Sequence, residues 1–269
     1  MEKLHHELWI VTAVNSLLGP PVRRLLEALG FHPADPVIPD YLVMVMLIVA
    51  GLTALCLVVR ARLSVERPGR LQILLEDVIA ALEGLLRDWI GPTGPRYLPL
   101  IATFAFFILA ANYAGLVPGL MAPTSNINVT LGCALTTWVY YHVQGMREQG
   151  VWPYLRHFAA PPGAPVWMAP VMLPIEIISH ASRVLSLSIR LFGNIFGEEL
   201  VILILFSIVP FLVPLPMMFL GLITGALQAF IFVLLSIIYL AGAVAVEHHG
   251  DEGRHGAHAP EAGHAPAAA

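Results

Sequence analysis

The sequence has few charged residues for its length. Only 12% of its 269 residues are Asp, Glu, Lys or Arg, and 58% are hydrophobic. A soluble domain of this size would carry about twice that charged fraction. The scarcity of charge therefore excludes an ordinary soluble protein and indicates a polytopic membrane protein, in which each bilayer-spanning helix needs roughly 20 apolar residues.

Cysteine, sequence repeats and catalytic motifs are also scarce or absent. The two cysteines, Cys56 and Cys133, each lie in an apolar segment, which argues against a disulfide framework or a thiolate metal site. No cleavable signal peptide is evident, and no internal repeat of the kind that builds secondary transporters stands out. Neither a GxSxG elbow nor an HExxH pair occurs, so a membrane-embedded hydrolase is disfavoured. We expect no metal, cofactor or nucleic acid.

Long apolar segments predict an all-α polytopic fold with about five membrane-embedded helices. They cover approximately residues 41–59, 97–116, 128–143, 166–206 and 217–246. Helices of about 36 and 30 residues in the last two would be roughly 54 and 45 Å long, against about 30 Å of hydrocarbon. We therefore expect both to be strongly tilted. Residues 63–96 place leucines at helical spacing beside charged residues, which predicts an amphipathic helix on the membrane surface.

The basic residues between the embedded segments predict how the chain is oriented in the membrane. With five embedded segments, one side receives nine basic residues, namely Arg60, Arg62, Arg67, Arg70, Arg87, Arg96, Arg147, Arg156 and Arg254. The other side receives Lys3, Arg23 and Arg24. The side with more basic residues is expected to be cytoplasmic. This gives an extracytoplasmic N-terminal segment at 1–40, a membrane domain at 41–246 and a cytoplasmic His-rich tail at 247–269, whose low complexity indicates disorder.

An arginine lies in the middle of the segment SLSIRLFGN, residues 186–194. Guanidinium keeps its proton at any relevant pH, and an arginine at the bilayer centre costs about 2.5 to 3.5 kcal/mol on insertion scales. With about 100° per residue, one polar stripe lies within about 40° of Arg190; it contains Glu176, Ser179, Arg183, Ser186 and Asn194. We interpret Arg190 as a fixed electrostatic gate that attracts a partner's carboxylate. Snorkelling, or pairing with Glu198 or Glu199, is the alternative.

The final apolar segment carries a second polar stripe. Small and polar residues recur on roughly one side of it, namely Gly221, Thr224, Gly225, Gln228, Tyr239 and Gly242. Two neighbouring helices with such stripes line hydrated paths or face a partner inside the membrane.

Four separated motifs resemble one known family. They are ANYAGLVPG, PTSNINVTL, RLFGNIFGEEL and LQAFIFVLLSIIYL, in this order along the chain. From about residue 40 to 246, the chain resembles subunit a of the F-type (bacterial) ATP synthase membrane sector. The resemblance implies a stationary proton-channel subunit of the bacterial inner (plasma) membrane, with nucleotide sites on other subunits. Its implied partners are the c-subunit ring, b-type peripheral stalk subunits and the remaining ATP synthase subunits.

The resemblance also implies roles for individual residues. Arg190 matches the arginine that faces the ring carboxyls and separates two offset half-channels. Asn194, Glu199 and Gln228 match positions of the outer half-channel and of the arginine's neighbourhood. A stripe toward the cytoplasmic exit is matched by Glu176, Ser179, Arg183 and Ser186. Tyr239 matches a tyrosine near the end of the last helix.

Three positions depart from the family pattern. Glu198 stands where the family has a small residue, Gly221 where some relatives have histidine, and Asn126 where many have aspartate. We favour Glu199 as the proton relay, with Glu198 helping or substituting, although an ideal helix puts Glu199 about 180° from Arg190 and Glu198 only about 80° away.

The role of His180 and the alternative function of the chain are also interpreted from the sequence. We expect His180, in the segment of Arg190, to be structural. A proton-coupled secondary transporter is the alternative function. Co-purification with a ring of small proteolipids distinguishes the channel subunit from that transporter.

Overall fold

The computed structural model describes residues 9–30, 36–117, 120–159, 168–208 and 214–244, and within them it is helical without strands. The α-helices are α1 (Trp9–Ala28), α2 (Asp40–Ala61), α3 (Arg70–Ile90), α4 (Leu98–Ala114), α5 (Ile127–Gln149), α6 (Val151–Ala159), α7 (Ala169–Ile208) and α8 (Pro214–Val244). Two 3-10 turns, η1 (Gly94–Tyr97) and η2 (Pro123–Ser125), precede α4 and α5. The all-α prediction is confirmed.

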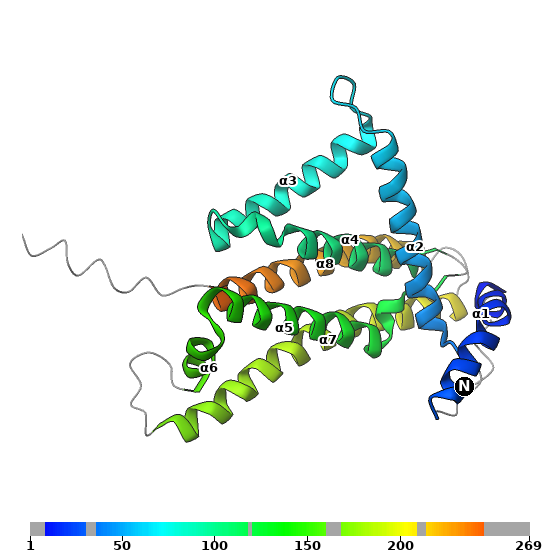
Figure 1. The fold of residues 1–269 in the computed structure, drawn as a ribbon. Helices are drawn as coiled ribbons and strands as arrows, with labels where there is room; N and C mark the ends of the chain where they lie inside the picture. The colour runs from blue at the N-terminus through cyan, green and yellow to red at the C-terminus, as the bar shows by residue number, and fades with distance from the viewer. Residues whose placement is uncertain (1–8, 31–35, 118–119, 160–167, 209–213, 245–269) are drawn as a thin grey trace, which may run out of the picture.

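Helices α4, α5, α7 and α8 form the central bundle (Figure 1). Its core contains Phe104 and Ile108 of α4, Leu187 and Leu191 of α7 and Phe232 of α8, all buried. A second cluster attaches α3 to the bundle, because Leu82 and Leu86 pack with residues of η1, α4, α5 and α8. Helix α2 contacts α4 on the outside of the bundle.

Within the described part of the chain, four helical stretches are long and apolar enough to cross a membrane, at residues 40–61, 94–114, 170–208 and 215–244. Helix α5, the other predicted embedded segment, is more polar, because Asn128, Thr136, Thr137, His142 and Gln144 interrupt its apolar residues. Helix α5 packs against α7 and α8 in the bundle. Polar residues on a helix of this kind are tolerated where other helices contact them.

The two last helices are long, as the sequence predicts. Helix α7 has 40 residues and α8 has 31, which correspond to about 60 and 46 Å at 1.5 Å per residue. Since the hydrocarbon layer is about 30 Å thick, such helices must incline or extend beyond it. Helix α7 can therefore carry a continuous polar stripe through the full depth of a membrane.

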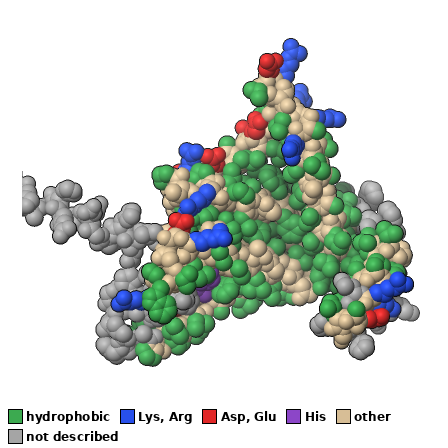
Figure 2. Space-filling model, viewed as in Figure 1, with side chains coloured by type: hydrophobic (Ala, Val, Ile, Leu, Met, Phe, Trp, Pro, Cys, Tyr) green, Lys and Arg blue, Asp and Glu red, His purple; other side chains and the backbone are tan. Residues whose placement is uncertain are grey.

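Helix α3 is amphipathic, as predicted. Only Leu82 and Leu86 of its 21 residues are buried, and Arg87 forms an ion pair with Glu83 on the outer surface. In Figure 2, hydrophobic side chains cover the bundle while charged ones gather toward its edges. The predicted tail at 247–269 lies outside the described residues, and the domain boundaries at 40 and 246 remain predictions.

Candidate functional site

Arg190 lies on the outer surface of α7. Leu187, Leu191 and Ile195, on an adjoining face of the helix, are buried in the bundle core, whereas Arg190 and Asn194 are exposed. Among the residues that the structure describes, none forms a hydrogen bond or ion pair with the Arg190 side chain. The positive charge is therefore presented outward, away from its own chain.

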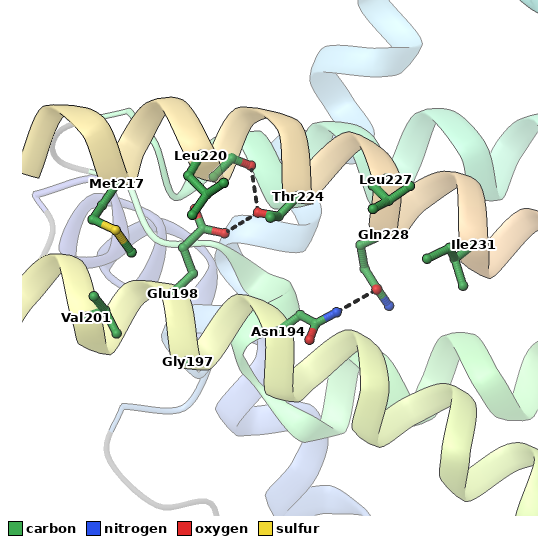
Figure 3. A pocket seen from close by; sticks show the side chains of 11 residues that line it. Asn194, Gly197, Glu198, Val201, Met217, Leu220, Thr224, Leu227, Gln228 and Ile231 are labelled. Carbon is green, nitrogen blue, oxygen red and sulfur yellow. Dashed lines mark hydrogen bonds between the residues drawn. The ribbon is translucent and has the colours of Figure 1, made fainter.

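A cavity of about 320 Å³ lies between α7 and α8, one helical turn from Arg190 (Figure 3). Its polar lining consists of Asn194, Glu198, Thr224 and Gln228. The rest of the lining is apolar or glycine. The two polar stripes that the sequence predicts meet at this cavity.

Gln228 is buried, with only 2% of its surface exposed. Its Oε1 accepts a hydrogen bond from Nδ2 of Asn194 at 2.8 Å, which joins α7 to α8 (Figure 3). Its Nε2 has no hydrogen-bond partner within the described chain. A buried amide donor without a partner is costly.

Glu198 points into the cavity. Its Oε2 accepts a hydrogen bond of 3.0 Å from the Thr224 hydroxyl on α8 (Figure 3). A Cβ atom at Gly221 would overlap Oε1 of Glu198. The glycine at 221 therefore provides the space that the Glu198 carboxylate occupies.

Glu199 points to a different place. Its Oε1 accepts a 3.0 Å hydrogen bond from the backbone N–H of Ala122, just before η2. The same oxygen would lie 3.0 Å from a Cβ at Gly115, after the end of α4. The two adjacent glutamates thus have different partners, and only Glu198 lines the cavity with Asn194 and Gln228.

A buried hydrogen-bond network connects η2, α4 and α8. The Thr124 hydroxyl donates to Oδ1 of Asn112 at 2.8 Å, and Nδ2 of Asn112 donates to the Gly225 carbonyl at 3.0 Å. Thr124 and Asn112 are almost fully buried. Our sequence analysis did not assign these residues, although both lie in motifs that carry the family resemblance.

A second group of polar side chains lies near the N-terminal half of α7. Glu176 and Tyr141 both hydrogen-bond to the His180 ring, and the Arg183 guanidinium lies 5.5 Å from the Tyr239 ring centroid. Nearby, the Tyr154 hydroxyl lies 2.7 Å from Nδ1 of His142. Burial raises the pKa of Tyr154, so its hydroxyl keeps its proton. The described residues contain no group of side chains suited to hold a metal ion.

Comparison with known proteins identifies the family. The sequence profile of the family described as ATP synthase A chain matches residues 41–241. The chain belongs to the ATP synthase subunit a family. It is 43% identical to ATP synthase subunit a of Citrifermentans bemidjiense over 226 residues, which cover 84% of this chain and 95% of that protein.

Further relatives carry the same description. The chain is 46% identical to ATP synthase subunit a of Syntrophobacter fumaroxidans over 238 residues, with 83% of this chain and 96% of the relative covered. It is 44% identical to ATP synthase subunit a 2 of Syntrophotalea carbinolica over 225 residues, with coverages of 84% and 91%. The family resemblance inferred from the motifs is confirmed.

The structure brings some of the predicted site residues together and separates others. Asn194, Glu198 and Gln228 meet at the cavity, whereas Glu199 lies beside Ala122. Glu176, Arg183 and Tyr239 lie in or near the His180 group. Ser179 lies beside His180 in the sequence of α7, and Ser186 lies between this group and the cavity.

Proposed function

We propose that this chain is the stationary proton-channel subunit of the ATP synthase and that Arg190 faces the carboxyl groups of a c-subunit ring. The observation that carries the proposal is the exposed position of Arg190 on a 40-residue membrane helix, without an ion-pair partner among the described residues. A charge at membrane depth needs compensation. Because its own described chain supplies none, the carboxylate that compensates Arg190 comes from a neighbouring subunit.

The arginine acts as an electrostatic gate. A ring carboxyl is stabilised in its ionised form opposite Arg190, and it must be protonated to face lipid because burying a lone charge in hydrocarbon is costly. The ring therefore turns only if each carboxyl loses its proton on one side of the arginine and gains one on the other. Since guanidinium does not deprotonate, protons cannot pass directly through Arg190.

The cavity between α7 and α8 forms part of the outer half-channel in this proposal. The hydrogen-bonded pair Asn194 and Gln228 lines the part of the cavity next to Arg190. Glu198 supplies a carboxylate that exchanges protons within the cavity. The departures from the family pattern at Glu198 and Gly221 support this assignment, since Gly221 leaves the space that Glu198 occupies. Glu199, at the α4–η2 connection, acts at an earlier point on the same path.

The cytoplasmic half-channel follows the other part of the α7 stripe, from Arg190 through Ser186, Arg183 and Ser179 to Glu176. Tyr239 on α8 supports this path by contacting Arg183. The excess of basic residues puts the N-terminal end of α7 and the C-terminus in the cytoplasm and the N-terminus in the periplasm, in a bacterial inner membrane. The membrane domain comprises residues 41–246, between the segments 1–40 and 247–269.

The chain does not catalyse ATP synthesis alone, because the nucleotide sites belong to other subunits. We propose that it assembles with the c-subunit ring, b-type peripheral stalk subunits and the remaining subunits of the synthase. The alternative, a proton-coupled secondary transporter, would compensate its membrane charge within its own chain. Among the described residues, no carboxylate pairs with Arg190.

Purification in mild detergent tests the proposal against this alternative. We expect the chain to co-isolate with a ring of small proteolipids, and to conduct protons in liposomes only together with that ring. A proton-coupled transport activity of the isolated monomer would contradict the channel proposal.

A further inference from the structure

A cluster of titratable side chains lies at the far end of α7 from the cavity. This cluster, which we name the His180 cluster, comprises Tyr141, His142, Tyr154, Glu176 and His180. Glu176 and Glu198 are 22 positions apart, or about 33 Å along an ideal helix. The cluster is therefore separate from the cavity beside Arg190.

Both ring nitrogens of His180 are hydrogen-bonded to groups that can exchange protons. Nδ1 lies 2.7 Å from the Tyr141 hydroxyl on α5, and Nε2 lies 3.1 Å from Oε1 of Glu176, one turn earlier on α7. The His180 side chain is 10% exposed and that of Glu176 is 37% exposed. His180 thus connects the buried interior to a carboxylate that reaches the surface.

With the ring in one position, its two hydrogen-bond partners, Tyr141 and Glu176, can bond to every protonation state of His180. A tyrosine hydroxyl can donate or accept a hydrogen bond, and a carboxyl group can accept when ionised or donate when protonated. When Nδ1–H donates to Tyr141, Nε2 can accept the proton of a neutral Glu176 carboxyl. The products are an imidazolium, with both nitrogens donating, and a Glu176 carboxylate, so the proton moves without displacement of heavy atoms.

Charges around the ring oppose one another. On α7, the Glu176 carboxylate bonds to Nε2 and favours a positive His180, whereas the Arg183 guanidinium, three positions further along the same helix, disfavours it. On α5, the His142 ring centroid lies 4.7 Å from that of His180, beside Tyr141. Tyr154 of α6 bonds to His142, and Tyr239 of α8 contacts Tyr141 and Arg183. Histidine is the side chain whose charge small effects of this kind change near neutral pH.

We propose that His180 is a proton-exchange residue of the cytoplasmic half-channel, and that the Glu176–His180 pair, rather than Glu176 alone, forms the end of this path. The pair stores a proton on the imidazole while the Glu176 carboxylate exchanges with water. This inference depends on the proposed channel function, and it assigns a transport role to a histidine that the sequence alone indicates as structural.

The test measures passive proton flux through the membrane sector in liposomes, with this chain, its ring and its stalk subunits but without the nucleotide-binding subunits. The pH on the cytoplasmic face is varied across the range in which histidine titrates, and flux is driven by a potassium diffusion potential. His180→Gln keeps an amide that can bond to Tyr141 and Glu176 but cannot store a proton. We expect flux to fall several-fold and its pH dependence in the histidine range to disappear.

Chemical rescue separates proton exchange from a structural role. In His180→Ala, imidazole added on the cytoplasmic face should restore flux, because it supplies the missing base in the space left by the side chain. Thr136→Ala is the control on α5. The Thr136 hydroxyl bonds only to a carbonyl of its own helix, so this variant should retain the flux and pH profile of the unmodified chain.

Two results would overturn the inference. One is an unchanged flux and pH profile in His180→Gln; the other is a loss in His180→Ala that imidazole does not restore while the ring still co-purifies. If His180→Ala does not assemble, His180→Gln alone decides. Arg190→Ala in the same liposomes tests the channel proposal itself. If the proton flux of Arg190→Ala differs from that of the unmodified chain while the flux of His180→Gln does not, only the role of His180 is refuted.

Discussion

At the scale of single residues, the two adjacent glutamates on α7 have different surroundings. Glu198 lines the cavity beside Asn194 and Gln228, whereas Glu199 bonds to the backbone of Ala122. We expect Glu198→Gln to reduce proton flux more than Glu199→Gln does, because the first substitution removes the titratable group of the cavity. Flux through reconstituted membrane sectors measures both variants. A larger loss in Glu199→Gln would instead restore Glu199 as the principal relay.

Gly221 provides a second residue-scale prediction. A methyl group there would overlap the Glu198 carboxylate, so Gly221→Ala should push that carboxylate out of place and lower proton flux. Gly242→Ala is the control on the same helix, since a Cβ at Gly242 meets nothing within 4 Å. Equal flux in the two variants would show that the fit between Gly221 and Glu198 is unimportant for transport.

At the scale of elements, the Thr124–Asn112–Gly225 network holds η2 against α4 and α8. Thr124→Val removes the hydroxyl and leaves the buried Oδ1 of Asn112 without its donor, which costs about 1–3 kcal/mol. We expect a lower melting temperature of the purified complex. Thr136→Val is the control, because Thr136 is exposed and bonds only to a carbonyl of its own helix. Equal melting temperatures would contradict a stabilising role for the network.

The helices themselves could largely be predicted from the sequence, whereas contacts between them could not. Apolar length predicts α2, α4, α7 and α8, and leucine spacing predicts α3, because both features are local. The helical wheel also indicates that Glu198 lies nearer than Glu199 to the side of Arg190. That Glu199 meets Ala122, and that His180 meets Tyr141, depends on packing between segments far apart in the chain, which periodicity does not describe.

At the scale of the whole molecule, α7 combines a buried side with an exposed polar stripe that contains Arg190 and Asn194, and polar residues of α8 line the cavity between the two helices. Residues such as Leu187 and Leu191 hold α7 in the bundle, and this packing turns Arg190 outward from it. The cavity and the His180 cluster lie on either side of Arg190 along α7. This arrangement suits two proton paths that are offset along one helix and separated by a permanent charge.

The central claim is that Arg190 gates proton movement against a neighbouring ring. The most direct measurement is ATP-driven proton pumping by membrane vesicles that contain the complete synthase with Arg190→Ala, with ring co-purification as the check on assembly. We predict that coupled pumping is abolished while the ring remains associated, because nothing then separates the two half-channels. Coupled pumping at the rate of the unmodified complex would contradict the account.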